Sequence, residues 1–282
     1  MIDCHLHCWT PGDGFAVRIR QRFDRLDQRF GLAETAPLCR EAAVSGVVLV
    51  SSAQDADETD RLFDEARRGI VPVVGIVGFI DPAVGDVEAR LDRWRTSPLF
   101  AGLRLPLPVM PAGWLEAPGT QALLDQLTRC GLIAEILATP EHLPEVLGTL
   151  RRRPELRVII DHAASPPVAS GDLYPWADWM GRLARDTSAV CKVCDFHLAG
   201  EAHLADEAIL PFLSHLLDVF GPERLIAGSN WPVSSLHEGY GDGFARLDRL
   251  MRRLGVAAAG RAAVLDSNAR TLFPAAAGIA PP

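Results

Sequence analysis

The first strand-like stretch of the chain carries two histidines in a His-x-His pattern. Alternate side chains of a β-strand lie on one face, so His5 and His7 would point the same way, with Asp3 behind them. Two imidazoles on one rigid strand suit a divalent metal ion, or a polarised carbonyl beside a water molecule. Two hydrogen-bonded histidines at a strand end would show the same spacing. The motif alone therefore leaves a metal site and a structural pair open.

Lys192 also stands out, because it is the only lysine among the 28 basic residues. Lysine differs from arginine in geometry and in how readily burial shifts its pKa, so its retention favours a role in a site over chance. The sequence does not decide which side chains of this strand point into the fold. Either Lys192 and Cys194 point into the fold, or Cys191, Val193 and Asp195 do.

Composition narrows the class of protein. The chain has 282 residues, of which 48% are apolar, enough for one large domain or two small ones with a sizeable core. The net charge is −8, and the only basic run is 151–153, so we expect no nucleic-acid surface. The longest apolar run spans 70–80, far short of the roughly 20 residues that a membrane helix needs. No basic-then-apolar leader opens the sequence, so we expect a cytoplasmic protein without membrane contact.

The six cysteines are expected to be small buried side chains rather than disulfides in such a protein. Cys191 and Cys194 have the spacing of a redox or zinc motif. However, the sequence contains no second pair of this kind, and no helix start follows Cys191. We therefore favour buried thiols over a redox or zinc motif.

Short apolar segments alternate with helical patterns along the whole chain. After the first strand around His5, strands are expected at 47–50, 71–79, 102–105, 132–137, 157–160, 189–193 and 224–227. Helices are expected at 37–45, 55–68, after 81, at 120–130, 139–153, around 176–179 and at 205–220. The stretch 13–34 also shows a helical period. Eight such repeats predict an α/β fold, a single-domain (β/α)₈ TIM barrel over 1–282, with extra C-terminal helices at about 243–273.

Polar residues follow the predicted strands where a barrel enzyme keeps its active site, at the carboxyl ends. They are His5, His7, the segment 51–54, Asp81, Arg104, Glu135, Asp161, His162, Lys192 and Asn230. Glu135 interrupts an otherwise apolar strand. A buried carboxylate is costly unless it is paired or binds a metal, so Glu135 is a candidate for the site.

Several motifs, taken together, resemble amidohydrolase family 2. They are Ile2-Asp3-x-His5-x-His7-x-Trp9, the segment 52–55, Gly102-x-Arg104-x-Pro106-Leu107, Asp161-His162, and the segments 220–225 and 228–233. The likeness is greatest to the branch of sugar lactonases and 2-pyrone-4,6-dicarboxylate lactonases. It implies a barrel that hydrolyses a small-molecule lactone, and it leaves open a divalent metal (zinc or manganese) or no metal. A small-molecule substrate is the expected partner, and apolar surface on the outer helices would support a homodimer.

The resemblance also implies roles for single residues. His5, His7 and His162 would bind the metal or polarise the carbonyl, and Arg104 would hold a substrate carboxylate through its guanidinium fork. From its charge, Lys192 would stabilise developing negative charge, and Glu135 would be a metal ligand or a base. Trp9 and Trp231 are expected to line the pocket, with Gln54 and Asp195 as further substrate contacts.

Position 230 departs from the family pattern, which usually reads Gly-Ser-Asp-Trp-Pro where this chain has Asn230. An amide cannot act as a general base, although it can orient water. Either another group is the base (Glu135, Asp195 or His162), or the barrel is a catalytically impaired binder, or Asn230 is an introduced substitution. A metal-dependent non-oxidative decarboxylase is the alternative enzyme, but it too would use the missing aspartate.

Overall fold

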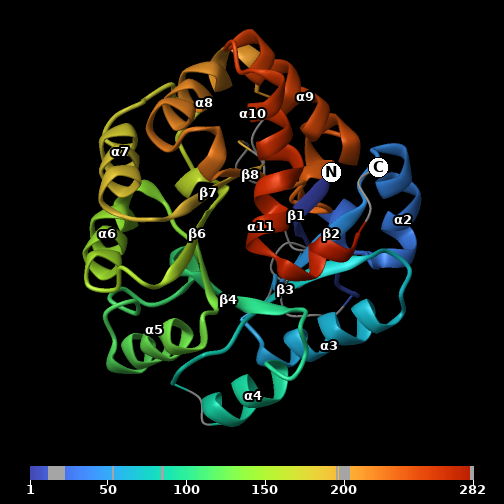
Figure 1. Cartoon of the computed structure of the whole chain (residues 1–282), viewed down its shortest axis with the longest axis vertical. Helices are drawn as coiled ribbons and strands as arrows, with labels where there is room; N and C mark the ends of the chain where they lie inside the picture. The colour runs from blue at the N-terminus through green and yellow to red at the C-terminus, as the bar shows by residue number, and fades with distance from the viewer. Residues whose placement is uncertain (12–22, 53, 84–85, 195, 197–203, 280–282) are drawn as a thin grey trace.

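Eight parallel strands form a barrel in which each strand pairs with the next along the chain (Figure 1). The computed structural model describes residues 1–11, 23–52, 54–83, 86–194, 196 and 204–279. The strands are β1 Ile2–Leu6, β2 Gly46–Val50, β3 Val73–Gly78, β4 Phe100–Pro106, β5 Ile133–Leu137, β6 Arg157–Asp161, β7 Val190–Val193 and β8 Leu225–Ala227. Between β1 and the segment after β8, the backbone of Asn230 donates to His5 and that of His7 donates to Trp231, which joins the two ends of the sheet. The predicted TIM barrel is confirmed.

Helices surround the barrel on its outer side (Figure 1). They are α2 Leu32–Glu41, α3 Ala56–Arg67, α4 Val87–Trp94, α5 Pro118–Cys130, α6 Leu143–Arg151, α7 Trp176–Asp186, α8 Asp206–Phe220, α9 Tyr240–Arg253, α10 Ala258–Ala262 and α11 Asn268–Leu272. Their apolar faces pack on the strands in one large buried cluster. No helix of the described residues is both long and apolar enough to cross a membrane.

The C-terminal segment covers the end of the barrel where the strands begin. A second buried cluster joins Ile2, Val48 and Ile133 of the strands to Ala269, Phe273 and other side chains of this segment. In Figure 1, α11 lies across the barrel. The amino-terminal ends of the strands are therefore closed by apolar packing, and polar chemistry is left to the opposite end.

Some predicted boundaries differ from the structure. The helix expected at 37–45 is α2, which begins at Leu32 with Pro37 inside it. Glu34 caps this start locally by accepting the Gly31 N–H at 2.9 Å, and Glu65 of α3 accepts the Leu32 N–H at 2.7 Å. The second contact comes from a distant residue and leaves no local signal. Within 13–34, residues 12–22 lie outside the described part, and Asp24–Leu26 is a single 3₁₀ turn rather than the expected helical continuation. Within the C-terminal helices expected at about 243–273, a π-helical turn, Ala263–Ser267, separates α10 from α11.

Gly102 permits the close approach of β4 to β5. A Cβ at this position would overlap the backbone carbonyl of Ile133, which cannot move without breaking the sheet. We expect Gly102→Ala to lower the free energy of unfolding by about 1–3 kcal/mol, as overpacking does. Gly148 in α6 is the matched control, since a Cβ there meets only the end of the Arg152 side chain at 3.8 Å. Gly148→Ala should stabilise the protein by roughly 0.5–1 kcal/mol. Urea unfolding of both variants checks the pair, and equal effects would contradict this account.

Candidate active site

Strand β1 places His5 and His7 inside the carboxyl end of the barrel, and the buried Asp3 carboxylate fixes the neighbouring β8 loop. Asp3 accepts the backbone N–H of His5 at 3.0 Å and of Ser229 at 2.8 Å. It also accepts the hydroxyls of Ser229 at 2.6 Å and Tyr240 at 2.9 Å. The position of Asn230, next to Ser229, thus depends on a carboxylate two residues before His5.

The two histidines contact each other through defined nitrogen atoms. His7 Nδ1 lies 2.8 Å from the Val50 carbonyl, which can only accept, so His7 carries its proton on Nδ1. Its Nε2 lone pair then faces His5 Nε2 at 3.0 Å. Burial, together with the charge of Arg104, lowers the pKa of His7 to about 3, so His7 is neutral. Burial likewise lowers the pKa of His5 well below its usual value.

Asp161 is the buried anion at the centre of the site. Its Oδ1 lies 3.1 Å from His5 Nδ1, and its Oδ2 accepts Arg104 Nη2 at 2.8 Å and lies 3.5 Å from His162 Nε2. Burial alone would raise the pKa of Asp161, but His162, His5 and Arg104 hold it well below its usual range. The ionised Oδ1 has no hydrogen-bond partner among the described residues. If His5 keeps its proton on Nε2 for His7, its Nδ1 lone pair faces this oxygen.

Lys192 and Glu135 form an ion pair beside His5, and neither side chain has any exposed surface. Lys192 Nζ lies 2.6 Å from Glu135 Oε2 and 3.2 Å from His5 Nδ1. Burial raises the pKa of Glu135 to about 7, with Lys192 opposing the rise. Burial would lower the pKa of Lys192, but Glu135 and Asp161 raise it. Lys192 therefore faces into the barrel, as does Cys194, which decides the strand facing that the sequence left open.

His162 is presented by a short left-handed turn after β6. Residues 162–165 all have positive φ, between 46° and 56°, which is unfavourable for residues other than glycine. Trp176 Nε1 donates to the Ala163 carbonyl at 2.8 Å, and the Ser165 N–H donates to His162 at 2.8 Å, which holds the turn. The ring of His162 then reaches Cys194, whose Sγ lies 3.1 Å and carbonyl oxygen 3.4 Å from Nδ1.

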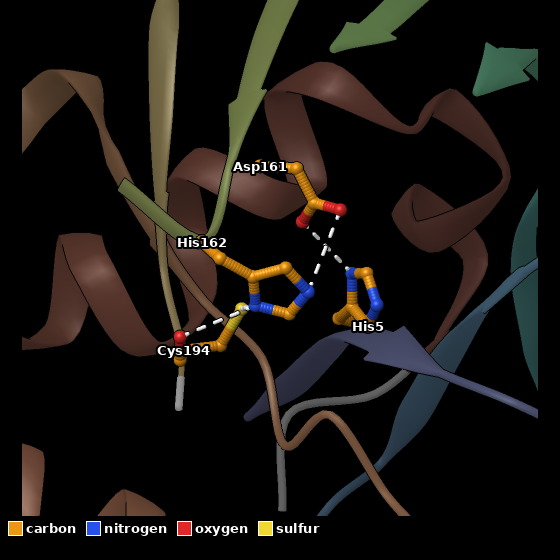
Figure 2. A group of neighbouring side chains, drawn as sticks. All are labelled: His5, Asp161, His162 and Cys194. Carbon is orange, nitrogen blue, oxygen red and sulfur yellow. Dashed lines mark hydrogen bonds and ion pairs between the residues drawn. The ribbon is translucent and has the colours of Figure 1, made fainter. Parts of the chain in front are cut away.

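Four side chains from three strand ends converge as a set of metal-ligand types (Figure 2). His5, Asp161, His162 and Cys194 each offer one ligand atom, and these atoms lie within 4.8 Å of one another. Asp161 Oδ1 accepts no hydrogen bond from the described residues and is the buried oxygen that a cation would satisfy. Nitrogen, oxygen and sulfur are the donors that zinc accepts. The residues therefore fit a divalent metal. His7, the third histidine expected at the metal, lies beside this group, with its Nε2 3.0 Å from His5 Nε2.

Comparison with known proteins supports a family assignment. The family model described as amidohydrolase matches residues 2–275. The L-fucono-1,5-lactonase of Burkholderia ambifaria is 33% identical over 242 residues, 86% of this chain and 83% of the relative. The chain belongs to the amidohydrolase family.

Two solved structures extend the comparison for this amidohydrolase. An amidohydrolase from Burkholderia multivorans, crystallised with bound zinc, superposes with a TM-score of 0.88 at 25% identity, over 97% of this chain and 98% of that one. A dihydroxybenzoic acid decarboxylase from Polaromonas sp. JS666, crystallised with manganese, gives a TM-score of 0.67 at 12% identity, covering 97% and 96%. The second likeness concerns the fold alone.

The remaining predicted site residues of the amidohydrolase lie in different surroundings. Trp9 is buried among other aromatic residues and donates from Nε1 to the Leu26 carbonyl at 3.1 Å. It also lines a cavity of about 190 Å³, whose lining does not include the four clustered residues. Trp231 is half-buried and contacts Phe30 and Tyr240. Gln54 is half-buried beyond β2, and Asp195 lies outside the described residues.

Sequence reasoning did not assign a site role to Asp161 or Cys194. Asp161 had a usable signal, since a carboxylate directly before His162 at a strand end is costly without partners. Cys194 had a weaker one, its two-residue spacing from Lys192 on the same strand. What the sequence could not show is that the left-handed turn brings His162 against Cys194.

A further buried carboxylate, Glu58 of α3, acts on Arg104 indirectly, through the residues at the end of β2. Glu58 accepts the Ser51 and Ser52 hydroxyls and the Ser52 N–H, the last at 2.9 Å, at the end of β2. The Ser51 carbonyl in turn accepts Arg104 Nη1 at 3.0 Å. Glu58 thus fixes the oxygen that orients the guanidinium.

We expect Glu58→Gln to lower the free energy of unfolding by about 1–3 kcal/mol. The glutamine NH₂ would replace one of the two oxygens that accept from Ser51 and Ser52, so at least one of these donors would lose its acceptor. Thermal or urea unfolding measures the loss. Glu88→Gln is the matched control, since Glu88 is exposed on a neighbouring helix. A Glu58→Gln variant as stable as the control would show that this carboxylate does not hold the end of β2.

Proposed function

We propose that this amidohydrolase hydrolyses a small lactone, and that a 1,5-lactone of a sugar acid is the first substrate class to test. The observation that carries the proposal is the convergence of His5, Asp161, His162 and Cys194 beside Arg104 at the carboxyl end of the barrel. The substrate class rests on the relative that is 33% identical and is named L-fucono-1,5-lactonase.

Lactone hydrolysis adds water across the ring ester bond. The water oxygen bonds to the carbonyl carbon, the bond to the ring oxygen breaks, and a proton is transferred to that oxygen, which gives a hydroxy acid. A divalent metal bound by the four clustered residues would polarise the carbonyl and make the attacking water more acidic. The clustered side chains themselves hold charge in a water-poor pocket, where electrostatic stabilisation is strong.

Arg104 is the residue best placed to hold the substrate. Its two terminal nitrogens donate to Ser51 and Asp161, whereas its buried Nε has no hydrogen-bond partner among the residues that the structure describes. A substrate oxygen would satisfy that donor. The Arg104 side chain is 8% exposed, so the contact would form at the bottom of the pocket.

Lys192 and Glu135 have no exposed surface, so we assign them to positioning His5 rather than to contact with the substrate. A pKa of about 7 would suit Glu135 as a general base. However, the buried carboxylate has no contact with solvent through which it could exchange a proton. His162, whose side chain is 13% exposed, and Asn230, which is 8% exposed, lie nearer the solvent. Asn230 would orient the attacking water. Removal of a proton from that water would be the slow step.

Asn230 also favours a second candidate, a barrel that binds its ligand without turning it over. A panel of lactones distinguishes the lactonase from the binding barrel. Hydrolysis is measured as the release of acid in weakly buffered solution. The panel contains sugar 1,5-lactones, L-fucono-1,5-lactone among them, and 2-pyrone-4,6-dicarboxylate. We expect turnover of at least one sugar lactone after loading with zinc, and a loss of more than about tenfold in kcat/KM for Arg104→Gln. Ligand-dependent stabilisation without any turnover would favour the binding barrel.

We expect Asn230→Asp to raise kcat on the best lactone by about tenfold or more, because a positioned general base contributes 10²–10⁴-fold. Asparagine and aspartate both tolerate the left-handed backbone at this position, where φ is 54°, so the change should not disturb the fold. Asn230→Ala provides the control for loss of the amide alone. If Asn230→Asp instead abolished activity, the asparagine would belong to a different mechanism.

A further inference from the structure

We propose that Cys194 is a thiolate ligand of the metal, and that this sulfur makes the site prefer zinc-like ions over manganese. The inference deepens the proposed lactonase site and rests on that function only for the expectation that a metal binds there. It concerns the ligand set of this chain, in which position 230 lacks the expected aspartate.

The geometry brings the sulfur to the other three donors. Cys194 follows β7, His162 follows β6 and His5 lies on β1, yet their donor atoms and that of Asp161 all lie within 4.8 Å of one another. Figure 2 shows the Asp161 carboxylate between the rings of His5 and His162, with Cys194 against the far side of His162. Cys194 is 6% exposed, so the sulfur lies inside the fold at the edge of the cluster.

Cys191 provides the internal contrast. It lies on the same strand but on the opposite face, fully buried in the apolar layer between strands and helices. Its thiol lies outside the group of potential ligands among the described residues. Only one of the two cysteines of this Cys-x-x-Cys segment therefore has the neighbours that a metal ligand needs.

The charges of the site also favour a thiolate. The group has one carboxylate, Asp161, and two imidazoles, so a divalent ion would keep an excess positive charge inside the barrel. A thiolate from Cys194 supplies the second negative charge that an aspartate at position 230 would otherwise supply. Thiolates favour zinc, cobalt and cadmium, whereas manganese prefers oxygen donors.

Metal binding must release the thiol proton. The S–H bond of Cys194 breaks, its electron pair stays on sulfur and becomes available to the metal, and the proton passes to solvent. His162 Nδ1 lies 3.1 Å from the sulfur, so its lone pair and the thiolate can face the same ion. The ring then keeps its proton on Nε2, which faces Asp161 Oδ2 at 3.5 Å. One proton reaches solvent for each ion bound.

The test uses metal-stripped protein titrated with cobalt, and no lactone is present. We expect wild type to bind one cobalt with a near-ultraviolet charge-transfer band from sulfur to metal. Cys194→Ser should lose this band and more than about tenfold in zinc affinity, while Cys191→Ala keeps both. Cys194→Asp should recover affinity without the sulfur band and should bind manganese better than wild type does. Circular dichroism confirms that each variant is folded.

The outcomes separate this inference from the proposed function. A cobalt-loaded wild type without the sulfur band overturns the inference even if no variant folds. So does a Cys194→Ser protein with unchanged spectrum and affinity. Because the readout is metal binding, a failure here leaves lactone hydrolysis standing, and a protein with the band but without lactonase activity leaves the ligand assignment standing.

Discussion

The site depends on one buried negative charge, the Asp161 carboxylate. It is fully buried, and an ion in that position is stable only when opposite charges and donors surround it. Arg104 supplies a charge-assisted hydrogen bond at 2.8 Å, while His5 and His162 face its two oxygens. Lys192 lies farther away at 3.9 Å and is engaged mainly by Glu135. The demand of this carboxylate for a cation explains why these side chains converge.

Two further buried carboxylates hold the segments from which the site is built. Asp3 binds the loop after β8 through Ser229 and Tyr240, and Glu58 binds the end of β2 through Ser51 and Ser52. Neither needs to contact a substrate. Each accepts hydrogen bonds from backbone and hydroxyl groups at a strand end, where the neighbouring strands no longer provide acceptors. The apolar C-terminal segment at the other end of the barrel leaves polar groups concentrated on one side.

The replacement at position 230 changes the balance between binding and chemistry. Asn230 keeps the backbone contact to His5 and the left-handed turn, so the architecture does not require an aspartate. Unlike an aspartate, it offers neither a negative charge nor a base at this position. The proximity of Cys194 to His162 and Asp161 offers a way to retain a metal ion without restoring the base.

The sequence by itself determined the α/β class, because apolar strands alternate with helical patterns along the whole chain, and eight such repeats at this length favoured a closed barrel over an open sheet. It also located His5, His7, Arg104, His162, Lys192 and Glu135, since polar residues at strand ends have few other reasons to be there. Tertiary structure decided their partners. The pairing of Lys192 with Glu135, the contact of His7 Nδ1 with the Val50 carbonyl and the hydrogen bond from Leu32 to Glu65 all depend on atoms distant in the chain. The contact of His162 with Cys194 depends on four consecutive left-handed residues, which only the packing of Trp176 and the rest of the barrel can hold in place.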